Sequence, residues 1–209
     1  MGTTMRRNTK KLCSALQGGF TLVEVMIAIV VMTIGLLAVL AAFATALAAT
    51  ESAQEDLIAR QKALEAMESI YTARNSQQIP FSAIANTTNG GMFVTGPSPL
   101  LCAGPDGLYG TTDDVPCTTQ PNGGGTACPN GGAQCLVLPG PDGILGTADD
   151  VTMSLSNFTR TIAINQVLLP NGTVNQNLMA VTVTVSYTKA GTPPRSVSYT
   201  ANGLISSYH

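Results

Sequence analysis

Glu24 is a lone acid in an apolar stretch, and its position is the first feature of the chain that requires a chemical explanation. Residues 25–49 carry no charged side chain, and this run is long enough to cross a membrane. An ionised carboxylate at the centre of a membrane costs about 3 kcal/mol unless a partner compensates it. The position of Glu24 therefore raises the question of what compensates its charge, unless the acid lies by chance at the membrane surface.

A second group of charged side chains lies in two nearly identical loops. The segments GPDGLYGTTDDV (104–115) and GPDGILGTADDV (140–151) are identical at nine of twelve positions and hold every acid after Glu68. These acids are Asp106, Asp113, Asp114, Asp142, Asp149 and Asp150. Clustered carboxylates repel one another, and Ca²⁺ is bound by carboxylate and carbonyl oxygens, so the loops predict calcium binding. The spacing is not that of an EF-hand, and the alternative is a duplicated Pro-Asp-Gly turn with solvated aspartates.

Four cysteines lie in the same part of the chain, and a fifth, Cys13, lies near its start. The four are Cys102, Cys117, Cys128 and Cys135. An even number of cysteines in a segment expected outside the cytoplasm predicts two disulfides, with three connectivities open. Pairing of nearest neighbours would close two short loops separately. Zinc is the alternative, although the sequence has no Cys-x-x-Cys pair.

The sequence offers little for catalysis or for nucleic-acid binding. Its single histidine is the terminal His209, and no nucleophile motif, phosphate loop or metal-binding histidine pair is present. Without residues 1–19 the chain has 6 basic and 12 acidic side chains (10 − 4 and 12 − 0), a net charge of −6. We expect a protein that is not an enzyme, binds no nucleic acid and needs no cofactor other than calcium.

The elements that position these residues follow from composition and periodicity. We predict an α+β fold in which a long N-terminal helix packs on a small antiparallel sheet beside a long, disulfide-bearing loop region. The expected parts are a basic leader (1–19), an apolar helix (20–49), an amphipathic continuation (50–79), a Gly/Pro-rich loop region (80–150) and the sheet (151–209).

Two patterns predict which faces of these elements are buried. On the helix, Leu57, Leu64, Met67 and Tyr71, with Ile58 and Ile70 beside them, form one apolar stripe. In the segment LMAVTVTVSYTK, valines alternate with Thr and Ser, which predicts a strand with one buried face.

The segment GGFTLVEVMIAIVVMTIGLLAVL, preceded by a short basic leader, resembles the N-terminus of prepilin-type proteins. These are the type IV pilins, the minor pilins and the type II secretion pseudopilins. The continuation TIGLL and the segment ATESAQEDLIARQKALEAMESI resemble minor pilins of the pilus-modification (PilV) type. The resemblance extends over about residues 7–75.

This resemblance implies a processing pathway and a location. A membrane prepilin peptidase would cleave between Gly19 and Phe20 on the cytoplasmic side and N-methylate Phe20. The Glu24 carboxylate would then pair with the Phe20 amine of a neighbouring subunit. The precursor would span the inner membrane once, with its N-terminus in the cytoplasm. It would engage the inner-membrane assembly platform and move into a pilus at the cell surface, among other pilins.

The resemblance implies a minor pilin that helps to initiate, modify or cap a type IV pilus. Within the same family, a major pilin and a type II secretion pseudopilin are alternatives. An alternative of another class is a membrane-tethered calcium-binding or adhesion module that does not polymerise.

Overall fold

A computed structural model describes residues 19–117, 128, 132–189 and 193–208. The leader predicted for residues 1–19 therefore lies outside the described residues, except for Gly19. The chain divides into two compact units, residues 1–49 and residues 50–209, and each is considered by itself.

The first element is the helix α1 (Leu22–Asn75), which begins two residues after its predicted start and ends four residues before its predicted end. Its first turn is capped by Thr21, whose hydroxyl accepts a hydrogen bond from the Glu24 backbone N–H at 3.2 Å. At the other end, Gln77 adopts a left-handed conformation (φ 58°). This lets the Gln78 N–H bond to the Ala73 carbonyl at 2.9 Å.

In the first unit, residues 22–49 of α1 expose every side chain. The most apolar window of the helix has a mean hydropathy of 2.9, and none of that window is buried. By length and composition α1 is able to cross a membrane, as the sequence predicted.

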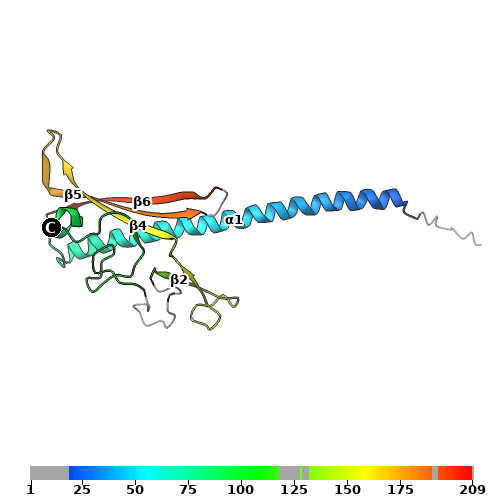
Figure 1. The fold of residues 1–209 in the computed structure, drawn as a ribbon, viewed down its shortest axis with the longest axis horizontal. Helices are drawn as coiled ribbons and strands as arrows, with labels where there is room; N and C mark the ends of the chain where they lie inside the picture. The colour runs from blue at the N-terminus through cyan, green and yellow to red at the C-terminus, as the bar shows by residue number, and fades with distance from the viewer. Residues whose placement is uncertain (1–18, 118–127, 129–131, 190–192, 209) are drawn as a thin grey trace, which may run out of the picture. The chain divides into compact units, whose positions relative to one another are not determined.

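In the second unit, the main sheet is antiparallel and has four strands in the order β1-β4-β5-β6 (Figure 1). Its strands are β1 (Ser98–Pro99), β4 (Phe158–Leu168), β5 (Val174–Lys189) and β6 (Arg195–Ser206). β5 is the central long strand: Ile162 of β4 faces Val183, and Val183 faces Ala201 of β6. The predicted meander is confirmed.

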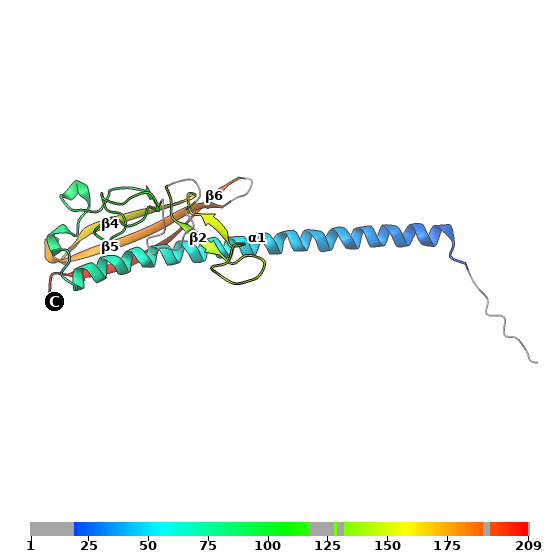
Figure 2. The same ribbon diagram turned by 90° about the horizontal axis from the view of Figure 1, so that it is seen from below.

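The core of the second unit lies between α1 and the inner face of this sheet. Figures 1 and 2 show β4, β5 and β6 running beside the part of α1 that follows residue 50. Along β5, Val181, Val183, Val185 and Tyr187 are buried and alternate with less buried residues, as the valine pattern predicted. Ile58, Met67 and Ile70 of α1 belong to the same apolar cluster.

The predicted helix stripe is only partly right. Ile58, Met67 and Ile70 are buried as predicted, but Leu57 and Leu64 are 64% and 44% exposed. Alanines that the sequence pattern did not include complete the buried face. The buried alanines of α1 are Ala59, Ala63, Ala66 and Ala73. Small side chains let the helix approach closely: a Cβ on Gly203 of β6 would lie 2.4 Å from the Tyr71 hydroxyl. A sequence pattern based only on large apolar residues does not identify these buried alanines.

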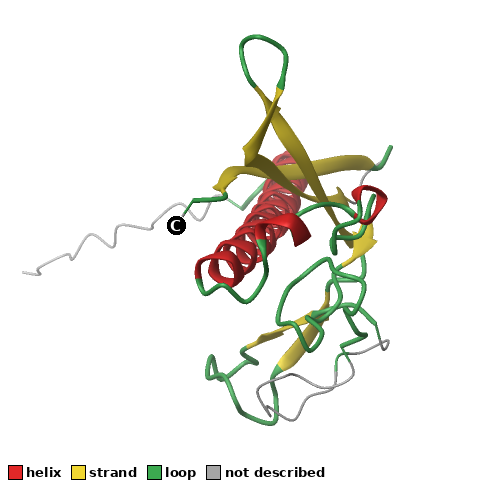
Figure 3. Cartoon of the chain, turned by 90° about the vertical axis from the view of Figure 1, so that its left-hand side faces the viewer, coloured by secondary structure: helices red, strands yellow, loops and turns green. Residues whose placement is uncertain are grey.

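The region predicted as loops contains more structure than expected. It holds β1, β2 (Cys135–Leu138) and the short 3₁₀ helices η1 (Phe81–Ala83) and η2 (Thr87–Asn89). β2 pairs with β3 (Val151–Ser154) in a separate two-stranded sheet. β3 lies within the range predicted for the sheet (151–209) but is not part of the main sheet. Figure 3 shows the main sheet on one side of α1 and the β2–β3 ribbon on the other.

Candidate functional site

Gly19 and Phe20 lie in extended chain just before α1 and make no packing contact that would require their identities. Phe20 is 82% exposed. A Cβ added to Gly19 would meet no atom within 4 Å, so the fold of this chain does not demand a glycine there. If Gly19 is needed, the need arises from another molecule that binds this segment.

Glu24 lies in the first turn of α1, where the unpaired backbone N–H groups favour a negative charge. Its side chain is exposed, and within the described part of the chain the carboxylate has no ion-pair partner. The described cations that pair with acids do so with Glu65, Asp114 and Asp56. A cation that compensates Glu24 in a membrane must therefore come from outside these residues.

Comparison with known protein families matches residues 15–47 to the prokaryotic N-terminal methylation motif. The chain carries a prepilin-type N-terminus. The match includes Gly19, Phe20 and Glu24 and most of the apolar run. No curated protein and no solved structure gives a significant match.

The motif supports a type IV pilin-like protein, in agreement with the resemblance drawn from the sequence. It implies processing by prepilin peptidase and assembly with other pilins in a membrane system. Pilins are structural proteins rather than enzymes. The α+β architecture, with a long N-terminal helix packed on an antiparallel sheet, is also pilin-like.

The pilin-like chain contains two disulfides, Cys102–Cys117 and Cys128–Cys135, with Cα–Cα distances of 5.2 and 5.5 Å. This is the nearest-neighbour pairing, one of the three that the sequence left open. The sequence separations are 15 and 7 residues. In the chain-entropy account, loops of this size contribute about 2–3 kcal/mol each to stability.

The two acidic loops fold alike, as their sequences predict. In each, the first aspartate accepts a hydrogen bond from the backbone N–H two residues later, at 2.8 Å (Asp106 to Leu108, Asp142 to Ile144). In each, the last aspartate accepts from a glycine N–H at 2.7 Å (Asp114 from Gly110, Asp150 from Gly146).

The middle aspartate of each loop accepts a threonine hydroxyl at 2.6 Å, from Thr111 to Asp113 and from Thr147 to Asp149. These hydroxyl bonds favour the ionised form and lower the pKa of both carboxyl groups. The carboxylates therefore hold their own loops together through protein donors.

The loops differ in their surroundings, because Arg160 of β4 lies under the first one only. Arg160 is 1% exposed, and its Nη2 lies 3.5 Å from Oδ2 of Asp114. Its guanidinium also lies 5.1 Å from the centre of the Tyr109 ring. Burial lowers the pKa of Arg160 and raises that of Asp114, so for both groups desolvation outweighs their mutual attraction.

Sequence reasoning missed Arg160. Arg160 stands at a position of β4 whose side chain faces the core, where an apolar residue is expected. A charged residue at such a position in an alternating strand pattern is the feature that could have identified it.

Within the described residues, no group of three or more His, Cys, Asp or Glu side chains is arranged to hold a metal ion. The structure brings the three predicted aspartates of each loop together. The backbone N–H of Asp106 donates to Asp113, and that of Asp142 donates to Asp149. Asp114 and Asp150 complete the two groups. Calcium binding stays a prediction.

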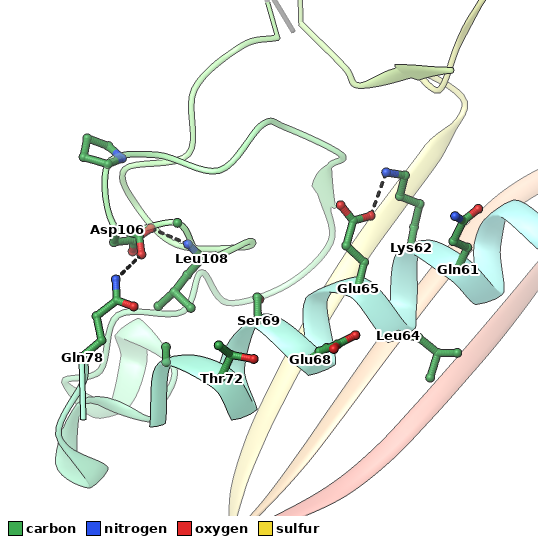
Figure 4. A pocket seen from close by; sticks show the side chains of 13 residues that line it. Gln61, Lys62, Leu64, Glu65, Glu68, Ser69, Thr72, Gln78, Asp106 and Leu108 are labelled. Carbon is green, nitrogen blue, oxygen red and sulfur yellow. Dashed lines mark hydrogen bonds and ion pairs between the residues drawn. The ribbon is translucent and has the colours of Figure 1, made fainter. Parts of the chain in front are cut away.

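A groove of about 770 Å³ runs between α1 and the first acidic loop (Figure 4). Two of its charged groups form an ion pair, with Lys62 Nζ 2.7 Å from Oε2 of Glu65. Across the groove, the Gln78 amide donates to the Asp106 carbonyl at 2.6 Å. The hydrogen bond from Gln78 to Asp106 joins the first acidic loop to the chain that follows the end of α1.

Proposed function

We propose that the chain is a prepilin-processed minor pilin that helps to initiate, modify or cap a type IV pilus. The observation that carries the proposal is the prepilin-type motif over residues 15–47, with Glu24 in the first turn of a helix able to cross a membrane. Prepilin peptidase cleaves between Gly19 and Phe20 and methylates the new amine of Phe20. A Cβ at Gly19 would meet no atom of the chain itself, and this supports a requirement for glycine that the peptidase imposes.

In this proposal the precursor spans the inner membrane with its N-terminus in the cytoplasm. The basic residues Arg6, Arg7, Lys10 and Lys11 precede the span, and basic residues stay on the cytoplasmic side. The inner-membrane assembly platform then moves the subunit from the membrane into the pilus.

During assembly, the Glu24 carboxylate pairs with the cationic Phe20 amine of a neighbouring subunit. An unpaired carboxylate in lipid costs about 3 kcal/mol, and the absence of an ion-pair partner for Glu24 within the described residues supports a partner from another subunit. The pair fixes register, because a subunit inserted at the wrong height leaves both charges unmatched.

The minor role rests on the C-terminal unit. A pilin head with two disulfides and a duplicated acidic loop is better suited to a specialised position than to a repeating shaft. A major pilin and a type II secretion pseudopilin share the same N-terminal chemistry and remain the alternatives. The amount of this chain in sheared filaments, relative to the dominant subunit, separates the minor role from the major one.

The proposal is tested with Gly19→Val, Glu24→Ala and the control Glu51→Ala, an exposed acid further along α1. We expect the unmodified chain to begin at N-methylated Phe20 in mass spectrometry and Gly19→Val to retain its leader. Glu24→Ala is cleaved but missing from sheared filaments, whereas Glu51→Ala is incorporated normally. An exported chain that still begins at Met1, or normal incorporation of Glu24→Ala, overturns the proposal.

A further inference from the structure

The two acidic loops offer a comparison within one molecule, because the same loop occurs once docked and once undocked. Their glycines share backbone conformations, with φ of 70° at both Gly107 and Gly143 and of 81° and 92° at Gly110 and Gly146. Together with the paired hydrogen bonds described above, these angles show that the fold of the loop does not depend on what it touches.

The first loop shows what kind of surface this loop recognises. Leu108 is 1% exposed in the core, and Tyr109 packs on the guanidinium of Arg160. Asp114 forms the ion pair with the same arginine. The docked loop therefore places the Tyr109 ring and the Asp114 carboxylate against an arginine and buries Leu108 in the core.

The second loop exposes the counterparts of Leu108 and Tyr109 to solvent, and its counterpart of Asp114 is half-buried. Ile144 and Leu145 replace Leu108 and Tyr109 in sequence and are each 61% exposed. Asp150, the counterpart of Asp114, has no cationic partner among the described residues. Adjacent exposed aliphatic side chains beside a carboxylate form a surface that is suited to a protein partner.

The chain itself displays a complementary surface on α1. Arg60 is exposed and makes no ion pair within the described residues, and Leu57 and Leu64 stand three residues before and four after it. Residues at these spacings share one helix face. This face consists of one arginine between two exposed leucines, and an arginine is also what Tyr109 and Asp114 of the first loop contact, at Arg160.

Other cations of the second unit fit less well. Arg74 is buried, and Lys62 and Lys189 are paired with Glu65 and Asp56. Arg195 is exposed but lies at the start of β6, opposite Lys189. The described residues therefore favour Arg60 as the counterpart of Asp150.

We propose that the second acidic loop (residues 140–151) docks on the Leu57–Arg60–Leu64 face of α1 in a second copy of this chain. Ile144 and Leu145 pack against the two leucines, and Asp150 pairs with Arg60. This contact goes beyond the proposed function, since it requires only that two copies lie in the same membrane and not that they enter a pilus.

The test is photo-crosslinking of the full chain in membranes, with p-benzoylphenylalanine at position 144. Two differently tagged copies are expressed together, and the crosslinked peptides are identified by mass spectrometry. We expect a crosslink between the two copies, on the peptide that contains Arg60. A crosslink within one copy, to another part of the second copy, to a different protein or to nothing overturns the proposal.

Charge reversal supplies the second readout. Arg60→Glu is expected to lower the crosslink yield about tenfold, and Asp150→Arg in the same chain is expected to restore it. The matched control, Arg195→Glu, leaves the yield unchanged. Equal losses in Arg60→Glu and Arg195→Glu, or no rescue by the double reversal, contradict the pairing of Asp150 with Arg60. Intact disulfides in all variants show that the heads are folded.

Discussion

Replacing Asp114 by alanine tests the view that the first acidic loop is fixed by a buried charge, and Asp150→Ala is its matched control. Both aspartates accept a glycine N–H at 2.7 Å inside loops of the same fold. Only Asp114 faces Arg160, whose guanidinium nitrogens lie in the core and have no hydrogen-bond partner among the described residues.

The expected magnitudes follow from this difference. Removing one partner of a buried ion pair leaves the other charge uncompensated and costs about 3–5 kcal/mol. Removing a hydrogen-bonded carboxylate from a partly exposed loop costs about 1 kcal/mol. We therefore expect Asp114→Ala to be less stable than Asp150→Ala by about 2–4 kcal/mol.

Urea unfolding of the full chain in detergent, followed by tyrosine fluorescence or near-UV circular dichroism, measures this difference. With a slope of about 2 kcal/mol/M, the two midpoints should differ by roughly 1–2 M. The double variant Asp114→Ala/Arg160→Met removes the orphaned charge as well, and we expect it to be more stable than Asp114→Ala alone. Equal midpoints for the Asp114 and Asp150 variants, or a double variant worse than the single one, would refute the reasoning.

Three further predictions concern other parts of the second unit. Tyr187 donates to Asp56 at 2.6 Å and lowers its pKa, so Tyr187→Phe should cost about 1 kcal/mol at pH 7. The lowered pKa of Asp56 stabilises the fold fully above the pKa of an unfolded aspartate, and this stabilisation is lost as the pH falls through the folded pKa. The cost of Tyr187→Phe should therefore shrink below about pH 4, which urea unfolding at about pH 7 and below about pH 4 measures. Gly110→Ala should lower the melting temperature more than Gly146→Ala, since both have positive φ but only at Gly110 does a Cβ meet a core side chain, at 2.5 Å. If the acidic loops bind calcium, EDTA should lower the melting temperature of the full chain, and an unchanged value would remove calcium from the account.

Local patterns were sufficient for most of the fold. The apolar run predicted the first half of α1, and alternation in the segment LMAVTVTVSYTK predicted the buried valines of β5. The helix face that packs on the sheet was predicted only in part, because Ile58, Met67 and Ile70 are buried but alanines take the place of Leu57 and Leu64. Alanine is common in any helix, and it becomes a packing residue only where a sheet approaches as closely as Gly203 allows.

The N-terminal motif could be recognised from the sequence because it is a short linear segment. Gly19, Phe20 and Glu24 lie within one stretch of six residues, so the motif shows without any tertiary contact. The pair of Asp114 and Arg160 joins residues far apart in the chain, and no local pattern connects them. The pairing of the four cysteines was open for the same reason, since three connectivities were compatible with the sequence.

In the duplicated loop, the local sequence determines the conformation, whereas residues elsewhere in the chain determine the burial. Its twelve residues specify their own conformation through aspartates that bind backbone N–H groups, so both copies fold alike. Whether a copy is buried is decided by a residue outside it, since Arg160 on β4 faces the first copy and no described cation pairs with the second. A loop whose conformation is independent of its surroundings presents the same recognition groups wherever it is placed. The second copy exposes Ile144 and Leu145 where the first copy buries Leu108 and packs Tyr109, and its Asp150 has no cationic partner among the described residues. In the proposed contact, Arg60 of a second chain takes the place that Arg160 of β4 has for the first loop.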